Sequence, residues 1–265
     1  MENPKVAIIT PTLGNSPFFS ETLDSIHLLT NFVHAIVCPP VHIQTLKTIA
    51  QNSIFVPETK ATGMYGALNQ AIDSLKEYDW DYLTYINDDD ILRIGFEESL
   101  SFARKRQADL VYGDVAVIRH GDTINKHLFP IMPVAIGIPR LLARGIVGVQ
   151  QPGSLYSRRL ITNLKGFDDS FRYSADLDIV IRALDKKYKV FYSGAQVAGF
   201  RIRAGQLSQA NSAMTLERKR IIGRISKSKW DWAYQFLFRT FNSPRYFRRW
   251  KNGLRSSRDV YSVGS

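Results

Sequence analysis

The sequence predicts an α/β fold, with a mostly parallel sheet flanked by helices and a helical extension at the C-terminal end. Three observations lead to this prediction: strand-like runs alternate with amphipathic helices, polar residues directly follow several strands, and positive charge gathers near the C-terminus. Strands separated by helices pair in parallel and bind ligands at their carboxyl ends. The 265 residues, 45% of them hydrophobic, suffice for one large domain with an extension.

The first third of the chain is regular. Runs of β-branched and aromatic residues indicate strands, and apolar residues three or four positions apart indicate helices. In chain order we expect strand 6–10, helix 18–29, strand 32–37, helix 43–50, strand 53–56, helix 65–75 and strand 82–86.

The remainder is less regular. We expect a helix at 97–107, a strand at 109–112 closed by Gly113-Asp114, and a hairpin of 115–119 with 123–128. The apolar, proline-broken segment 127–149 is either a functional loop or lid or a hydrophobic loop packed on the core, and the sequence leaves both open.

Composition limits the class of protein. A single cysteine, Cys38, excludes a disulfide framework and is typical of a reducing compartment. The N-terminus enters a strand at once, without the layout of a signal peptide. No window approaches the roughly 18 uninterrupted apolar residues of a membrane span. We therefore expect a cytoplasmic protein.

An acidic cluster follows the strand at 82–86, where Asn87 precedes Asp88, Asp89 and Asp90. Adjacent carboxylates repel one another unless a cation lies among them. Hard oxygen ligands of this kind suit Mg²⁺ or Mn²⁺, which commonly bridge to substrate phosphates. The alternative is an Asp-rich turn that caps the next helix.

A second acidic segment opens a helix near Asp176, as the helical spacing of Leu177, Val180 and Ile181 shows. Ser174 or Asp176 could cap this helix. A carboxylate here could instead act as a base if an apolar pocket or neighbouring acids raise its pKa. The sequence leaves cap and base open.

Together these motifs resemble the family 2 glycosyltransferases, which have the GT-A fold. The resemblance covers roughly residues 4 to 208, and its motifs stand in the family's order: VAIITPT, NQAI, YLTYINDDDI, QQPGSLYSRR and GFDDSFRYSADLDIVIRAL. It implies transfer of a sugar from a nucleotide-diphosphate sugar, with inversion at the anomeric carbon and with Mn²⁺ or Mg²⁺ as cofactor.

The resemblance also implies roles for single residues. Those that would bind the donor are Thr10, Pro11, Thr12, Leu13, Asn69, Asn87 and Asp88. Asp89 would ligate the metal, with Asp90 as the alternative ligand. Asp176 would be the general base, with Asp178 as a partner on the same helix, and Gln150 and Gln151 would line the acceptor side.

Two other functions stay open. A nucleotidyltransferase also pairs acids with a metal, but it needs a Gly-rich, basic phosphate loop after the first strand, and segment 11–17 has one glycine and no basic residue. A catalytically silent nucleotide-sugar-binding subunit would keep the fold, but intact Asp88, Asp89 and Asp176 count against it.

The C-terminal segment carries the charge. The whole chain has a net charge of +11, and residues 217–259 hold thirteen Lys and Arg against three acids. Aromatic residues follow one helical face up to Phe241 and another after Pro244. Such stripes suit an anionic membrane surface. They suit packing on the body nearly as well, and nucleic acid less well.

We therefore expect a catalytic domain at 1–212 and a basic, aromatic-rich extension at 213–265. The expected function is an inverting, metal-dependent glycosyltransferase in bacterial surface polysaccharide synthesis. It would act on a glycan or lipid-linked acceptor and lie at the inner face of the plasma membrane, bound through residues 217–259.

Overall fold

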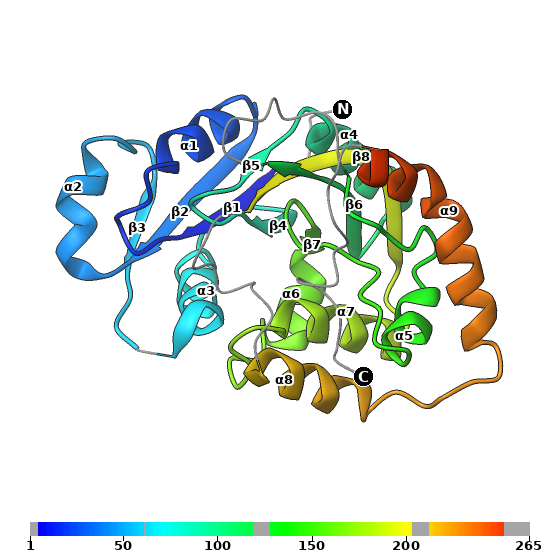
Figure 1. Ribbon diagram of the computed structural model, residues 1–265. Coiled ribbons are helices and arrows are strands. Elements are labelled where there is room, and N and C mark those ends of the chain that lie inside the picture. Colours follow the sequence, from blue (N-terminus) through cyan, green and yellow to red (C-terminus); the bar gives the residue numbers. More distant parts are fainter. Residues whose placement is uncertain (1–4, 61, 119–127, 203–211, 252–265) are drawn as a thin grey trace.

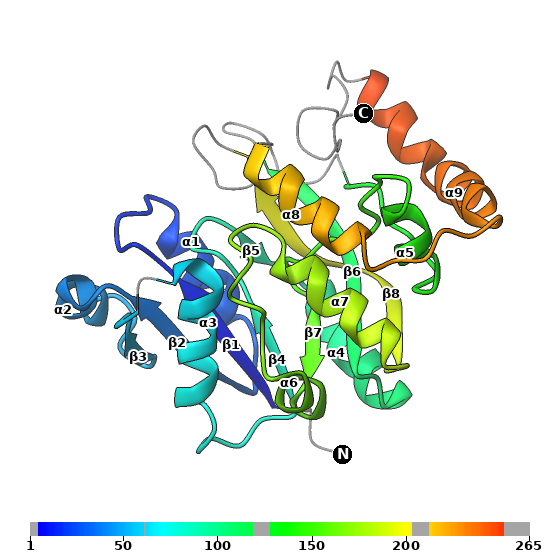
Figure 2. The same cartoon turned by 90° about the horizontal axis from the view of Figure 1, so that it is seen from below.

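The computed structural model describes residues 5–60, 62–118, 128–202 and 212–251, and of residues 249–251 only the backbone. A mixed eight-stranded sheet crosses the molecule, and helices cover both of its faces (Figures 1 and 2). The strand order is β3-β2-β1-β4-β7-β6-β8-β5.

The strands are β1 (Val6–Pro11), β2 (Phe32–Cys38), β3 (Ile54–Pro57), β4 (Tyr82–Tyr85), β5 (Ile91–Leu92), β6 (Leu110–Ile118), β7 (Leu155–Ser157) and β8 (Val190–Arg201). The α-helices are α1 (Phe19–His27), α2 (Ile43–Lys47), α3 (Gly63–Ser74), α4 (Gly95–Arg106), α5 (Gly137–Leu142), α6 (Arg158–Leu164), α7 (Ala175–Asp185), α8 (Ser212–Ile222) and α9 (Asp231–Lys251). A 3₁₀ turn, η1 (Pro40–His42), precedes α2.

The first half of the sheet is parallel. Strand β1 pairs in parallel with both β2 and β4, and β2 pairs in parallel with β3. In the second half β7 is antiparallel to β4 and β6, whereas β8 is parallel to β6 and antiparallel to β5. The chain progresses outward in opposite directions from β1, so a crevice opens at the carboxyl ends of β1 and β4.

Two hydrophobic cores lie on the two faces of the sheet, and the alternation of side chains along β1 shows why. Val6 and Ile8 join the core that includes residues of α1 and α4. Ala7 and Ile9 point the other way, into the larger core formed with α3, α6 and α7. Successive residues of a strand face opposite sides of the sheet, so a buried parallel strand is apolar at every position.

The prediction that a strand ends at Gly113-Asp114 is wrong, because β6 runs without a break from Leu110 to Ile118. A Cβ on Gly113 would lie 2.6 Å from the carbonyl oxygen of Ala195, and the register between β6 and β8 shifts at this point. Glycine here permits close approach of two strands and makes no turn. Most of the expected return strand, 123–128, lies outside the described residues.

The described part of the proline-broken segment 127–149 packs on the core. This is the second of the two alternatives that the sequence left open. It contains α5, and its residues Ile131, Met132, Ile138 and Leu141 are fully buried in the larger core. A hydrophobic segment with its own short helix therefore completes the core below the sheet, and only its end reaches the site described below.

The C-terminal extension also packs on the body, through one face of each helix. Ile221 of α8 and Phe238 of α9 belong to the larger core. Asn242 is fully buried and exchanges two hydrogen bonds with the backbone of Ile131, and Arg245 pairs with Asp114 of β6 at 2.7 Å. Pro244 lies inside α9 without ending it, so the two separate aromatic faces expected around it belong to one helix.

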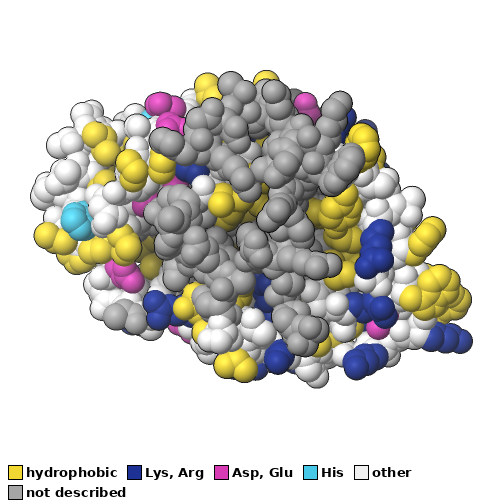
Figure 3. Space-filling model, in the orientation of Figure 1, with side chains coloured by type: hydrophobic (Ala, Val, Ile, Leu, Met, Phe, Trp, Pro, Cys, Tyr) yellow, Lys and Arg dark blue, Asp and Glu magenta, His cyan; other side chains and the backbone are white. Residues whose placement is uncertain are grey.

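The opposite face of α9 stays exposed. Its largest exposed side chains are Trp232, Phe236 and Phe247, each more than 60% exposed. Figure 3 shows hydrophobic and basic side chains side by side along the edge that α9 forms. Across the described parts of the chain, no helix combines the length and the apolar character needed to cross a membrane.

Candidate functional site

A cavity of about 670 Å³ opens where β1 and β4 end. Its walls come from the loops after these two strands, from the start of α3, from the segment before β7 and from the start of α7. Because β7 runs antiparallel to β4, the residues that precede β7 reach the same edge of the sheet. This is the edge at which open α/β sheets bind their ligands.

The loop after β1 forms one wall. Pro11, Thr12 and Leu13, which were expected to bind the nucleotide, line the cavity. The Thr12 hydroxyl donates to Oδ2 of Asp88 at 2.5 Å, and Ser16 donates to the carbonyl oxygen of Asp88 at 2.7 Å. The β1 loop and the acidic cluster are therefore joined into one unit.

Thr10 does not reach this wall. It is fully buried, and its hydroxyl forms a 3.0 Å hydrogen bond with Nε2 of His34 on the neighbouring strand. The other ring nitrogen of His34 is 2.8 Å from the Ser53 hydroxyl. The side chain of Thr10 thus joins β1 to β2. Thr10 was expected to line the nucleotide pocket largely through its backbone, but it is not among the residues that line this cavity.

The acidic cluster divides into three residues that line the cavity and one that does not. Asn87, Asp88 and Asp89 line the cavity. Asp90 is fully buried and accepts hydrogen bonds from the backbone N–H of Arg201 at 2.8 Å and from the Asn87 amide at 3.2 Å. Burial, and then the charge of Asp89, raise the pKa of Asp90 well above its usual range. Asp90 therefore anchors β8 below the site, which argues against its role as the alternative metal ligand.

The chemistry of the cavity wall fits a hard divalent cation. Asp88 and Asp89 line one cavity, and carboxylate oxygens suit Mg²⁺ or Mn²⁺. No group of three or more His, Cys, Asp or Glu with metal-binding geometry exists within the described ranges. Mg²⁺ in nucleotide sites is commonly held by one or two carboxylates together with substrate phosphates. The protein therefore needs to supply no more than two carboxylate ligands.

Asp176 lies across the cavity from this wall, in the first turn of α7. Its Oδ1 accepts the Tyr65 hydroxyl at 3.1 Å and the backbone N–H of Leu177 at 2.8 Å. Burial raises the pKa of Asp176, while these hydrogen bonds and the charge of Arg218 oppose the rise. A carboxylate with an elevated pKa in a cleft is a candidate general base.

Ser174 occupies the N-cap position of α7, but its side chain makes no capping hydrogen bond. It is 2% exposed and lines the cavity, and its hydroxyl has no hydrogen-bond partner among the residues that the structure describes. Buried hydroxyls are normally paired, so this one is a candidate contact for a bound ligand.

Asn69 joins α3 to the loop before α7 and does not line the cavity. Its amide nitrogen donates to the carbonyl oxygen of Phe167 at 2.8 Å, and its amide oxygen accepts the N–H of Phe167 at 3.0 Å. These bonds dock the loop before α7 on α3. The expectation that Asn69 faces the donor is therefore not met in this geometry.

Both glutamines expected on the acceptor side line the cavity. Gln151 donates from Nε2 to the carbonyl oxygen of Tyr85 at 2.8 Å, which fixes the segment before β7 on the end of β4. Gln150 is buried, and its backbone carbonyl accepts the Ser154 hydroxyl at 3.0 Å.

The structure also brings residues into the cavity that sequence reasoning missed. Tyr65, Ser174, Met214 and Arg218 all line it. Arg218 is 8% exposed and belongs to α8, within the segment expected to lie outside the catalytic domain. The sequence does not distinguish Arg218 as a site residue, because it is one of thirteen basic residues in the segment 217–259.

Comparison with known proteins finds no matching family model and no matching curated protein. Solved structures of TarS from S. aureus do match. Residues 1–349 of TarS in complex with UDP-GlcNAc give a TM-score of 0.63 at 14% identity, over 93% of this chain and 73% of that one. The complex with UDP gives 0.60 at 14% identity, over 96% and 73%.

A longer TarS chain gives a TM-score of 0.60 at 13% identity, over 92% of this chain and 43% of that one. At such identities the likeness concerns the fold. The predicted fold class is confirmed: the chain has an α/β fold of the GT-A type, which it shares with TarS.

Proposed function

We propose that this protein is a glycosyltransferase that moves a sugar from a nucleoside-diphosphate sugar to an acceptor hydroxyl, with inversion at the anomeric carbon. One observation carries the proposal: Asp88 and Asp89 on one wall and Asp176 on another line a single cavity at the carboxyl ends of parallel strands. The solved TarS structures, one of which holds UDP-GlcNAc and another UDP, support a nucleotide-sugar donor.

The donor end of the cavity is the loop after β1 together with the acidic cluster. Pro11, Thr12 and Leu13 would hold the nucleotide, with Asn87 and Asp88 beside it. Asp89, supported by Asp88, would hold Mn²⁺ or Mg²⁺. When bound, this ion would neutralise the charge that develops on the leaving diphosphate.

Asp176 would take the proton. The acceptor oxygen forms a bond to the anomeric carbon while the bond from that carbon to the diphosphate oxygen breaks, and the electron pair leaves with the diphosphate. The proton of the acceptor hydroxyl passes to Asp176. Buried Tyr65, Tyr85 and Tyr156 line the same cavity as Asp176. Burial raises the pKa of Asp176, although the Tyr65 hydrogen bond opposes the rise, and the raised pKa makes the carboxylate a stronger base.

A nucleotide and metal screen tests the proposal. We expect UDP, GDP or dTDP to raise the melting temperature of the protein, and Mn²⁺ to increase the effect of the nucleotide that binds. The corresponding nucleotide sugar should then release its nucleoside diphosphate, and NMR of the product should show the inverted anomer. Formation of pyrophosphate from a nucleoside triphosphate would favour the nucleotidyltransferase. Nucleotide binding without turnover would favour the silent subunit.

We also propose that α9 places the enzyme on an anionic membrane, at the inner face of the plasma membrane, where a glycan or lipid-linked acceptor would be found. The supporting observation is the exposed face of α9, where Trp232, Phe236 and Phe247 lie near Arg239 and Arg248. Aromatic residues beside cations suit the headgroup region of such a membrane. A role in bacterial surface polysaccharide synthesis rests on this placement.

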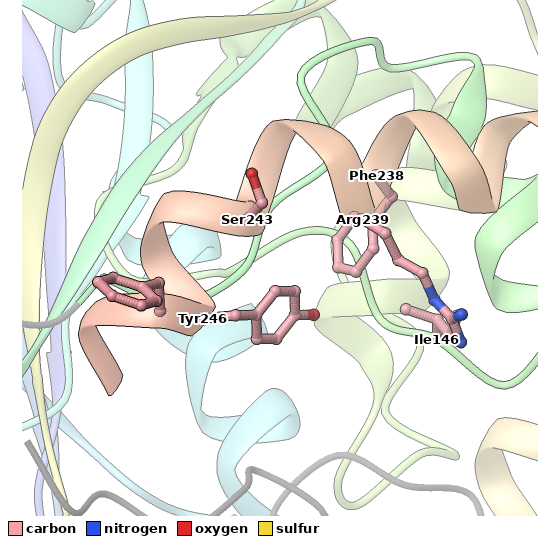
Figure 4. Close-up of a pocket in the computed structure, with 6 residues that line it drawn as sticks. Ile146, Phe238, Arg239, Ser243 and Tyr246 are labelled. Carbon is pink, nitrogen blue, oxygen red and sulfur yellow. The ribbon is translucent and has the colours of Figure 1, made fainter. Parts of the chain in front are cut away.

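A shallow hollow of about 650 Å³ lies beside this face, where α9 meets Ile146 of the body (Figure 4). Its walls include Ile146, Phe238 and Tyr246, with the Arg239 guanidinium at one end. An apolar hollow with a cation at its margin would accept a lipid chain together with its phosphate.

Removal of the whole extension is an unsuitable test, because Ile221 and Phe238 belong to the core. The double variant Trp232→Ser and Phe236→Ser changes only exposed side chains. We expect it to lose most of its flotation with phosphatidylglycerol vesicles and to keep nucleotide binding. The control Leu28→Ser, at an 80% exposed position on the end of α1, should float like the wild type. Equal flotation of all three proteins would refute the membrane proposal.

A further inference from the structure

Helix α8 lies across the segment that carries Asp176 (Figure 2). Its Glu217 accepts two successive backbone hydrogen bonds from that segment. Oε1 of Glu217 is 2.6 Å from the N–H of Arg172, and Oε2 is 2.8 Å from the N–H of Tyr173. One carboxylate thus holds the turn that leads directly into Ser174 and α7.

The far end of α8 is tied to the same segment. Arg224, two residues beyond the helix, pairs with Oδ1 of Asp178 at 2.6 Å. Asp178 is fully buried, and its other oxygen pairs with Arg182 at 2.6 Å. The side chain of Asp178 therefore serves this attachment and not the cavity.

An aromatic contact lies between the two attachments. The guanidinium groups of Arg220 and Arg224 lie over the ring of Phe171, at 4.8 and 5.6 Å from its centre. Phe171 is itself fully buried, so the ring is fixed in the core. Cation–π contacts of this kind reinforce the attachment of α8 to the start of the turn.

One face of α8 is turned toward the reaction site. Met214 and Arg218 line the cavity, and Ile221 is buried in the core. The helix is held at its middle by Glu217 and just beyond its C-terminal end by Arg224, so a movement of this part of α8 would also move the turn that Glu217 holds. The carboxylate of Asp176 lies three residues beyond Tyr173, with no other extended element between.

We propose that Glu217 is a positioning residue for the proposed base Asp176, acting through the backbone of Arg172 and Tyr173. The proposal rests on the proposed function. Catalysis by a positioned group is sensitive to its placement, and a misplacement of about 1 Å can cost about 10²-fold in rate. The C-terminal extension then contributes to the geometry of proton transfer as well as to the stability of the fold.

The test compares Glu217→Ala and Glu217→Gln with the control Glu98→Gln, an exposed glutamate in the first turn of α4. The assay is release of nucleoside diphosphate from the nucleotide sugar that the screen above selects. We expect Glu217→Ala to lower kcat by about 10- to 100-fold with less than a threefold change in KM for the donor. Glu217→Gln keeps one acceptor oxygen, so its kcat should lie between that of Glu217→Ala and that of the wild type.

The pH profile separates positioning from simple loss of folded protein. The charge of Arg218 lowers the pKa of Asp176, so loosening of α8 should move the acidic limb of kcat to higher pH. Partial unfolding would lower kcat equally at all pH values and would reduce the number of nucleotide sites per chain. A uniform loss of that kind, or unchanged kcat in Glu217→Ala, would overturn the proposal.

Hydrogen exchange gives a readout that needs no activity. In Glu217→Ala the amides of Arg172 and Tyr173 should exchange faster, with no such change in Glu98→Gln. Unchanged exchange would overturn the proposal even in an active enzyme. A wild type that turns over no nucleotide sugar, combined with faster exchange in Glu217→Ala, would refute the proposed function and leave the attachment of α8 to this turn in place.

Discussion

Tyr65 donates its hydroxyl to Asp176 over 3.1 Å, and this hydrogen bond joins α3 to α7 across the floor of the cavity. The two residues are 111 positions apart in the chain. The bond stabilises the charged form of Asp176 in a place where burial disfavours it. It thereby sets how strong a base the carboxylate can be.

Substitution of Asp176 by Asn should separate binding from chemistry. The amide keeps the shape of the side chain but cannot accept a proton. We expect transfer to fall by about 10² or more, the range typical of general-base loss, while nucleotide affinity changes little. Calorimetry with the nucleoside diphosphate and a turnover assay would measure the two effects. Near-normal transfer would show that Asp176 has only a structural role at the start of α7.

Removal of the Tyr65 hydroxyl should change the pH dependence. In Tyr65→Phe the carboxylate of Asp176 loses a hydrogen bond that lowers its pKa, so its pKa should rise. Because the base must be deprotonated, the acidic limb of the rate profile should move to higher pH, with the plateau less affected. The matched variant Tyr156→Phe changes another buried tyrosine of the cavity, whose hydroxyl bonds to Ser154 instead. If the acidic limb of the rate profile in Tyr65→Phe stayed at the wild-type pH, the Tyr65 hydroxyl would not set the pKa of Asp176.

The two inner members of the acidic cluster should differ sharply. We expect Asp89→Ala to abolish the part of nucleotide binding that depends on Mn²⁺, because Asp89 faces the cavity. Asp90→Asn should retain it, because Asp90 is buried beneath the site with a raised pKa, so a neutral side chain is accommodated there. Thermal shifts with nucleotide, with and without Mn²⁺, would report both. If Asp90→Asn lost Mn²⁺-dependent nucleotide binding and Asp89→Ala retained it, the metal ligand would be Asp90 and not Asp89.

His34 should make the protein sensitive to acid. Burial lowers the pKa of His34 from 6.5 to about 3. Below pH 6.5 the unfolded chain therefore binds a proton that the folded chain does not, so stability falls as pH decreases through this range. The slope is at most about 1.4 kcal/mol per pH unit from this one group.

In urea titrations at pH 7, 6 and 5, the free energy of unfolding of His34→Gln should fall less steeply with decreasing pH than that of the wild type. This holds whatever the stability of the variant at pH 7. The partly exposed His42 offers the control, and His42→Gln should keep the wild-type slope. A slope in His34→Gln that equals that of the wild type would show that other groups govern acid unfolding.

Asn242, in the middle of α9, should matter for the stability of the fold. Its amide satisfies both the N–H and the carbonyl of Ile131 at 3.0 and 2.8 Å in the core. Asn242→Ala leaves these buried backbone groups unpaired and should lower the free energy of unfolding by about 2–3 kcal/mol. The neighbouring Ser243→Ala, at an exposed position, should change it by less than about 0.5 kcal/mol. Equal effects in the two variants would argue against this docking of α9.

Much of the fold was predictable because the first third of the chain obeys simple patterns. Strand β1 is apolar at each of Val6, Ala7, Ile8 and Ile9, as a strand covered on both faces must be. The same patterns failed at Gly113-Asp114, where residues typical of turns lie within a long strand. The reason is the close approach of β8, and a neighbour distant in sequence leaves no local signal.

The site was predictable in part for the same reason. Asp88, Asp89 and Asp176 stand at element ends, where pattern and chemistry agree, and the structure brings them to one cavity. Asn69 was misplaced because its partner, the backbone of Phe167, is 98 positions away. Phe236 and Phe238 show the same limit in the extension: one is 68% exposed and the other 3%, although both belong to one aromatic run.

Thr12 and Arg218 line the same cavity, although most of the chain separates them. During synthesis on the ribosome the parallel strands β1 to β4 emerge first and have their pairing partners at once. The cavity is completed only when α8 has emerged and folded back, a contact of long sequence separation that forms slowly. A nascent chain therefore forms most of its sheet well before the cavity is complete, so the activity that we propose would be acquired late in its biogenesis.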